Sequence, residues 1–161
     1  MTDLWVVNAS PIISLANCGC LELINKLCDE AVVPQSVVDE IIAGPESDPA
    51  RLAIEGGWGI RIRSPVPCTD LIEWGLGAGE TAVLALAQER SPATVVLDDA
   101  VGRACAKAMN VQVIGTIGII IRAKKRSLIP SAATAIASLR DTGLYLSDDV
   151  VAGALRYCGE E

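Results

Sequence analysis

The alternation of apolar and polar positions predicts short strands and helices that follow one another along the chain. Apolar runs rich in β-branched residues and bounded by turn residues have the pattern of strands; they cover residues 4–8, 31–33, 58–63, 94–97 and 111–114. Stretches with apolar residues three and four positions apart have the pattern of helices; they cover residues 11–19, 20–27, 35–43, 49–55, 77–87, 100–109, 117–126, 131–140 and 148–158. Strands that alternate with helices indicate an α/β fold, with a parallel sheet covered by helices on both faces.

Polar residues at the expected helix starts support this division of the chain. Ser10, Asp48, Thr116 and Ser147 each precede an apolar helical stretch. Their side-chain oxygens can accept hydrogen bonds from the free backbone N–H groups of a first helical turn. We therefore expect these residues as caps, with Pro11 at the first position of the helix that Ser10 starts.

The region between residues 58 and 74 is expected at the edge of the sheet. Residues 58–63 alternate apolar with polar or small side chains, which is typical of a half-exposed edge strand. Residues 64–74 contain two prolines and show neither a helical nor a strand period, so we expect an irregular connection there.

The stretch from residue 77 to residue 99 organises the expected site. Residues 77–87 predict a helix that is apolar on nearly every side, and therefore buried, with Glu80 in its first turn. The following strand stops at Asp98 and Asp99. Helix starts and strand ends share one edge of an open α/β sheet, and such folds bind their ligands at that edge. We therefore expect the three carboxylates to converge.

The same edge is expected to collect further oxygen-bearing side chains. Asn8 and Ser10 follow the first strand, and Thr116 follows the last. Glu40 lies about 9 Å along its helix if that helix begins at Pro34, but its side chain leans back toward the helix start. Oxygen ligands alone suit Mg²⁺ or Mn²⁺ rather than zinc. Such an ion can orient a phosphodiester and activate water.

Composition narrows the class of protein. The chain has 161 residues, of which 51% are hydrophobic and 20% charged, so we expect one globular domain over residues 1–161 and exclude disorder. No apolar run approaches the roughly 18 residues of a membrane span, and the first residues have no basic segment of the kind found in signal peptides. We therefore expect a cytoplasmic protein with no membrane partner.

The absence of histidine removes several kinds of catalytic site. Without histidine, a zinc site and most nucleophile–base triads are disfavoured. The spacing of Cys18 and Cys20 is not the Cys-x-x-Cys of zinc and redox sites. We expect the six cysteines to be reduced and to act as small buried apolar residues.

The net charge of −7 argues against broad electrostatic binding to nucleic acid. Local basic patches remain, and two are candidates for contacts with nucleic acid. Their members are Arg103 and Lys107 in one patch, and Arg122, Lys124, Lys125 and Arg126 in the other. The second patch also has a simpler explanation, since a basic helix end is often only a solvated surface.

An ordered set of motifs resembles the PIN domain. The set comprises Val6–Ile13, the helix that carries Glu40, Gly77–Thr81, Leu97–Asp99 with Gly102 and Arg103, and Ile114–Gly118. It is similar in particular to the subfamily that opens with Asn-x-Ser-Pro, and it covers nearly the whole chain. The resemblance implies a three-layer α/β/α fold with a five-stranded, mainly parallel sheet. It also implies metal-dependent cleavage of single-stranded RNA, a toxin held inactive by a small antitoxin protein, and a homodimer.

The resemblance assigns the acidic residues of the family's site to positions in this chain. Glu40 falls on the second acid, Glu80 on the third, and one of Asp98 and Asp99 on the fourth. Asn8 falls where most PIN nucleases have aspartate, so the site would lose one negative charge and some affinity for metal.

The position of an auxiliary hydroxyl in the family falls near Thr116. Two functions follow from the resemblance and from the asparagine. One is a ribonuclease that uses Mg²⁺ or Mn²⁺, and the other is a weak or inactive PIN-like module that binds RNA or a protein.

Each candidate also has a structural explanation. Asn8 can close a turn through its own backbone, Glu40 can be a solvated helix position, and the helix dipole alone favours Glu80. Either Asp98 or Asp99 can cap the next helix, which would leave the other free. A phosphoacceptor signalling domain has a similar sheet, but it needs an acidic pair after the first strand, where this chain has Asn8 and Ala9.

Overall fold

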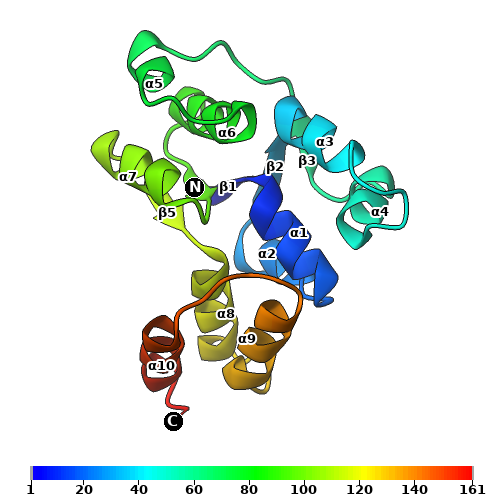
Figure 1. Ribbon diagram of the computed structural model, residues 1–161. Coiled ribbons are helices and arrows are strands. Elements are labelled where there is room, and N and C mark those ends of the chain that lie inside the picture. Colours follow the sequence, from blue (N-terminus) through cyan, green and yellow to red (C-terminus); the bar gives the residue numbers. More distant parts are fainter. Residues whose placement is uncertain (1, 161) are drawn as a thin grey trace.

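The expected sheet is present, and every pair of neighbouring strands in it is parallel. In the computed structural model, which describes residues 2–160, the strand order is β3-β2-β1-β4-β5 (Figure 1). The strands are β1 (Leu4–Val7), β2 (Glu30–Pro34), β3 (Ile60–Ile62), β4 (Thr94–Val96) and β5 (Gln112–Ile114). The five-stranded parallel α/β/α architecture is thereby confirmed, as is the position of β3 at one edge.

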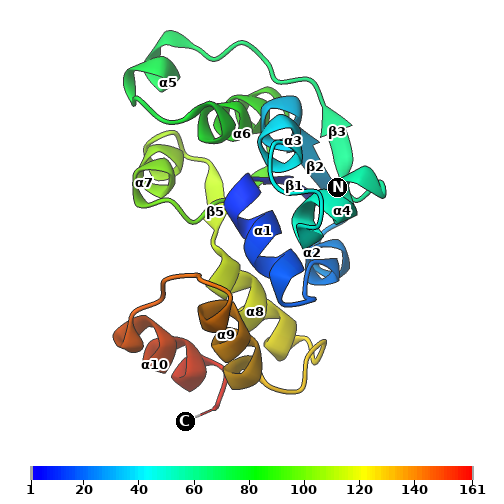
Figure 2. The ribbon, with the colours of Figure 1, turned by 45° about the vertical axis from the view of Figure 1, so that its right-hand side comes forward.

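Helices cover both faces of this sheet (Figures 1 and 2). They are α1 (Ala9–Asn17), α2 (Glu22–Leu27), α3 (Gln35–Ile42), α4 (Pro49–Glu55), α5 (Thr69–Glu73), α6 (Ala78–Glu89), α7 (Ala100–Ala108), α8 (Thr116–Lys125), α9 (Ala132–Asp141) and α10 (Asp148–Tyr157). Right-handed crossovers put α1 and α2 on one face and α6 and α7 on the other. None of the helices within residues 2–160 has the length and apolar character needed to cross a membrane.

The core is built around β1 and α6. All four residues of β1 are buried, because it is the central strand and both of its faces are covered. Residues 82–87 of α6 are all buried as well, since α6 packs against β1, β2 and β4 and also against α3 and α5. The expectation that residues 77–87 form a buried helix is confirmed.

Two of the expected caps are found, at Asp48 and Ser147. The Asp48 side chain accepts from the Ala50 N–H at 3.3 Å, and the Ser147 hydroxyl accepts from the Val150 N–H at 3.2 Å. Each of these helices begins at the residue after its cap, as the sequence indicates.

The other two expected caps, Ser10 and Thr116, are wrong. Helix α1 already begins at Ala9, so Pro11 is its third residue rather than its first. A proline is tolerated there because the N–H groups of the whole first turn have no partner within the helix. Helix α8 begins at Thr116 itself, after Gly115, because the threonine side chain is used in a bond to another segment.

Helix α5 lies in the connection that was expected to be irregular. It has five residues, and of these only Leu71 is buried. Such a short helix carries no period that a sequence pattern could reveal, and the prolines that precede it conceal its start. It packs on the outer side of α6.

Candidate active site

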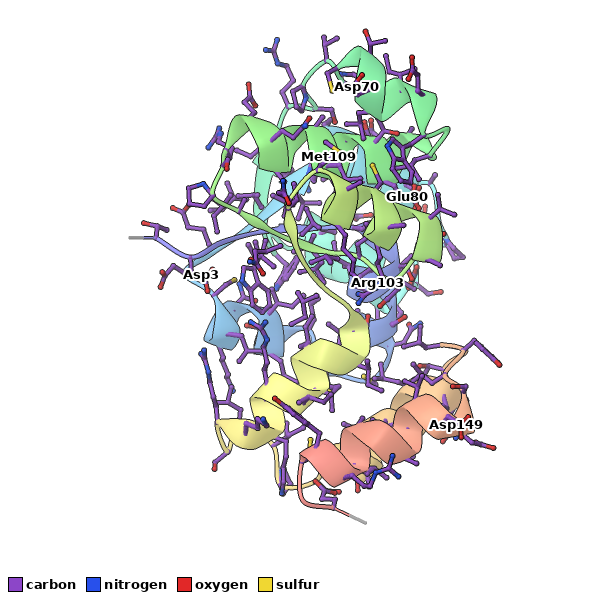
Figure 3. The ribbon with its side chains drawn as sticks, turned by 90° about the vertical axis from the view of Figure 1, so that its left-hand side faces the viewer. Asp3, Asp70, Glu80, Arg103, Met109 and Asp149 are labelled. Carbon is purple, nitrogen blue, oxygen red and sulfur yellow. The ribbon has the colours of Figure 1, made fainter. Side chains whose placement is uncertain are left out.

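The ends of β1, β4 and β5 bring three site candidates to one edge of the sheet. The Asn8 N–H donates to the Val96 carbonyl at 3.1 Å, and the Leu97 N–H donates to the Ile114 carbonyl at 3.0 Å. These bonds continue the parallel ladder by one residue, so Asn8, Asp98 and Thr116 follow neighbouring strand ends. In Figure 3, Glu80 and Arg103 lie on the side of the molecule where these strands end, and Asp3, just before β1, lies on the opposite side.

Asn8 and Glu40 converge over the first turn of α6. Asn8 Oδ1 lies 3.3 Å, and Glu40 Oε1 3.4 Å, from the point that a Cβ of residue 79 would occupy. A side chain at that position would crowd both oxygens, so Gly79 lets the end of β1 and the middle of α3 approach the start of α6. The structure thus brings together two candidates that lie far apart in sequence.

Glu80 completes this acidic pocket, which we define as Asn8, Glu40 and Glu80 around Gly79. Its Oε2 lies 2.7 Å from the Cβ position of Gly77, so the carboxylate folds back over the start of its own helix. The pKa of Glu40 is raised, first by removal of water around its carboxyl group and second by the charge of Glu80. The two carboxylates therefore repel each other across the pocket.

The Asn8 side chain is buried but is not used to close a turn. Asn8 is only 4% exposed, and its side chain makes no capping hydrogen bond to α1. No buried side-chain nitrogen or oxygen among the described residues lacks a hydrogen-bond partner, so the amide end of Asn8 reaches solvent. Its oxygen is therefore available to a ligand in the acidic pocket.

Asp98 and Asp99 accept hydrogen bonds from different segments. Asp99 caps α7, because its Oδ2 accepts from the Gly102 N–H at 2.7 Å, which fulfils the expectation that one of the pair would be a cap. Asp98 is not left free: its Oδ1 accepts from the Thr116 N–H at 2.7 Å and its Oδ2 from the Thr116 hydroxyl at 2.6 Å. Asp98 is therefore a fixed group beyond the end of β4.

Arg103 borders the site beside Asp98. Its Nη1 donates to the Leu97 carbonyl at 3.1 Å and lies 2.9 Å from the Cβ position of Gly115. Gly115 has no room for a side chain, because the Asp98 carboxylate also lies 3.0 Å from that point. The remaining donors of the guanidinium group can serve a ligand.

The acidic pocket fits a hydrated divalent cation. Within residues 2–160 no three side chains of the types His, Cys, Asp and Glu lie together as a metal cluster. The pocket instead offers two carboxylates and one amide oxygen. Mg²⁺ keeps several waters and needs only one or two carboxylates plus substrate phosphates. The oxygens of the two carboxylates and of the Asn8 amide therefore suit such an ion.

The basic candidates separate into two groups. Arg103, Arg122 and Lys125 line one groove of about 600 Å³ between β5, α8 and the segment that leads into α10, which we call the α8 groove. Lys107 lies in the last turn of α7, far from the helix start at the site. Lys124 donates to the Pro130 carbonyl at 2.9 Å. Arg126 ends α8 outside the groove, and Ser10 is exposed on α1.

Sequence reasoning missed Tyr145 and Tyr157, which both line the α8 groove. These are the only two tyrosines of a chain without phenylalanine. Their exposure, 87% and 66%, is unusual for aromatic side chains. The sequence offered one signal for this site: Tyr145 is a rare aromatic residue that lies two positions before Ser147, the cap of α10.

Comparison with known proteins agrees with this architecture. No curated protein matches the chain. A family model described as PIN domain matches residues 4–160, which is nearly the whole chain and includes every residue of the acidic pocket. The chain therefore belongs to the PIN-domain family, within the PIN nuclease superfamily.

Proposed function

We propose that this protein is an endonuclease that cleaves single-stranded RNA with the help of Mg²⁺ or Mn²⁺. The observation that supports it most is the acidic pocket, in which oxygens from Asn8 and Glu40 lie beside Gly79 and Glu80 faces Glu40. These groups follow β1 or belong to α3 and α6, and the tendency of α/β proteins to bind ligands where strands end and helices start supports a ligand site there.

Each residue of the site has a distinct role in this proposal. Asn8 and Glu80 would hold the ion, and Glu40, whose pKa is raised, would accept a proton from the attacking water. The chemistry that a divalent ion would supply there is Lewis-acid polarisation of the phosphodiester and a lower pKa of that water. Arg103 offers its free guanidinium donors to a phosphate of the substrate. Asp98 and Thr116 keep the strand ends at this edge in register.

A cleavage assay with a matched control tests the proposal. The substrate is a fluorescent single-stranded RNA with Mn²⁺, and the variants are Glu80→Gln and Glu89→Gln. Both residues belong to α6, but Glu89 lies at the other end of the helix. We expect Glu80→Gln to lower the rate by about 100-fold or more and Glu89→Gln to leave it unchanged. Equal activity of the Glu80 and Glu89 variants would contradict the mechanism.

A weak or inactive module that binds RNA or a protein is the second candidate, and Asn8 favours it. An amide in place of a carboxylate removes one negative charge from the pocket and lowers its attraction for a cation. Calorimetric titration with Mn²⁺ separates the two functions. Binding that Glu80→Gln abolishes and Asn8→Asp strengthens supports the nuclease. No binding by either the wild type or Asn8→Asp supports the inactive module.

The cellular role that we propose is that of a cytoplasmic toxin, homodimeric and restrained by a small antitoxin protein. The resemblance to PIN-domain toxins supports this role. Controlled expression in a bacterium tests it, since the wild type should arrest growth and Glu80→Gln should not. Light scattering of the purified protein tests the dimer.

A further inference from the structure

We propose that the α8 groove binds the stretch of single-stranded RNA next to the scissile phosphate. One base would stack on Tyr145, and the phosphates would lie against Arg122 and Lys125. This inference rests on the proposed function, because it names where the substrate of that site continues beyond the acidic pocket.

The groove is continuous with the candidate active site. Its lining includes Asp98 and Arg103, which approach each other at Gly115. Asp98 follows β4, and β4 lies beside β1, the strand that leads to Asn8. At its other end it reaches Tyr145, in the connection between α9 and α10, which lies on the same side of the molecule as α7 in Figure 2. A strand that leaves the acidic pocket past Arg103 therefore enters this groove.

The charge of the groove is opposite to that of the protein. The whole chain carries −7. The charged side chains that line the groove are Arg103, Arg122, Lys125 and Asp98, and both oxygens of Asp98 are already bonded to Thr116. A cationic groove on an acidic protein favours a polyanion at this one place.

Two aromatic rings hold the cations in position. The Lys125 ammonium lies 3.4 Å from the centre of the Tyr157 ring, and the Arg122 guanidinium lies 5.8 Å from the centre of the Trp5 ring. Contacts of this kind attract a cation to the ring face. Both contacts therefore favour positions of the two cations in the lining of the groove before any ligand binds.

Tyr145 is the ring that remains free. It is 87% exposed and contacts neither of these cations. An exposed ring next to these cations matches the way proteins bind single strands, with bases stacked on aromatic rings and phosphates on basic side chains. Paired bases inside a duplex cannot reach such a ring, so the geometry favours a single strand.

Binding measured without catalysis tests this inference. The probe is a fluorescein-labelled RNA of twelve nucleotides without self-complementarity, and anisotropy is recorded in EDTA so that no cleavage occurs. We expect Tyr145→Ala to weaken binding about 5-fold or more, because stacking contributes that much per base. Tyr145→Phe keeps the ring face and should bind like the wild type. The same RNA in a duplex should bind more weakly.

The cations are tested through the salt dependence of binding. Arg122→Ala and Lys125→Ala should each weaken binding and reduce the slope of log K against log salt by about 0.7, the value for one phosphate contact to a single strand. Arg90→Ala and Lys26→Ala remove the same charges from the ends of α6 and α2, outside the groove, and should leave the slope unchanged.

The outcomes separate this inference from the proposed function. Tyr145-dependent binding without any cleavage in Mn²⁺ supports the groove and contradicts the nuclease. Cleavage by the wild type with equal kcat/KM in Tyr145→Ala supports the nuclease and overturns the groove. Failure of the wild type to bind the RNA, or equal losses in the groove variants and in Arg90→Ala and Lys26→Ala, also overturns the groove.

Discussion

Thr116 bonds both carboxylate oxygens of Asp98, through its N–H at 2.7 Å and its hydroxyl at 2.6 Å. Asp98 lies two residues after β4 and Thr116 is the first residue of α8, so the pair ties two segments together at the edge of the sheet. Thr116 has no exposed surface, and hydrogen bonds to an ionised acceptor are stronger than neutral ones. The pair therefore fixes Asp98 in the lining of the α8 groove.

Replacement of Thr116 by valine should destabilise the protein. Valine keeps the shape and the backbone N–H but removes the hydroxyl from the Asp98 carboxylate. We expect the free energy of unfolding to fall by about 1–2 kcal/mol, measured by urea denaturation. Thr116→Ser keeps the hydroxyl and should lose less. Equal stability of the valine variant and the wild type would show that the hydroxyl bond contributes nothing.

Replacement of Gly79 by alanine should damage the acidic pocket. The new Cβ would meet the Asn8 oxygen at 3.3 Å, which is closer than ordinary contact, and the Glu40 oxygen at 3.4 Å, at the short limit of ordinary contact. We expect weaker Mn²⁺ binding in calorimetry and slower RNA cleavage. Gly153→Ala in α10 is the matched control: its Cβ meets only one Arg156 nitrogen at 4.0 Å, so it should raise stability by about 0.5–1 kcal/mol. Unchanged Mn²⁺ binding by Gly79→Ala would show that the pocket tolerates the crowding.

Most of the fold could be predicted from the sequence because it depends on local patterns. The apolar strands that alternate with helices allow few arrangements once crossovers must be right-handed. Helix α5 could not be predicted, because it is too short for a period. The predicted caps at Ser10 and Thr116 were wrong for another reason, because contacts and tolerances beyond the local capping rule decide where these helices begin. The first turn of α1 tolerates a proline, so the helix starts before Ser10. The Thr116 hydroxyl binds Asp98 instead of capping α8.

The candidate site could be predicted in part, since strand ends and helix starts share one edge whatever the side chains are. The sequence indicated that Asn8, Glu40 and Glu80 would approach one another, and the structure places them around Gly79. The sequence could not show which side chains form hydrogen bonds with each other, because the bond between Asp98 and Thr116 joins positions 18 residues apart. The exposure of Tyr145 likewise depends on the path of the chain between α9 and α10.

The pKa of Glu40 should be measurable above that of an ordinary glutamate, and it should fall when Glu80 is neutralised. Loss of water raises the pKa first, and the charge of Glu80 adds to it. The ionised form is therefore disfavoured in the folded state, and this cost disappears as the pH falls through the raised pKa. NMR titration of the glutamate side-chain carbons should show a lower Glu40 midpoint in Glu80→Gln.

Glu89→Gln is the control for that titration, because Glu89 lies at the far end of α6. It should leave the Glu40 midpoint unchanged. Since an ionised Glu40 adds negative charge beside the ion-binding oxygens of Asn8 and Glu80, Mn²⁺ binding should also strengthen as the pH rises through this midpoint. A Glu40 midpoint that is the same in Glu80→Gln and the wild type would show that the two carboxylates do not interact.

Glu160 should stabilise the protein in a pH-dependent way. Its carboxylate accepts from the Ala132 N–H at 2.7 Å, the Ala133 N–H at 3.2 Å and the Ser131 hydroxyl at 3.1 Å, so it holds the end of the chain to the start of α9. Lys124 Nζ lies 3.5 Å away. The backbone bonds from Ala132 and Ala133 lower the pKa of Glu160 more than any other group does.

Because the folded pKa of Glu160 is lowered, its contribution is complete above the pKa of an unfolded glutamate and is lost as the pH falls through the lowered value. Glu160→Gln should therefore lower the Tm at pH 7, while at a pH below both values the variant and the wild type should unfold at nearly the same temperature. Thermal unfolding followed by circular dichroism at both pH values measures this difference, with Glu89→Gln as a control for loss of one surface charge. A Tm difference that persists unchanged in acid would mean that Glu160 acts through packing rather than through its charge.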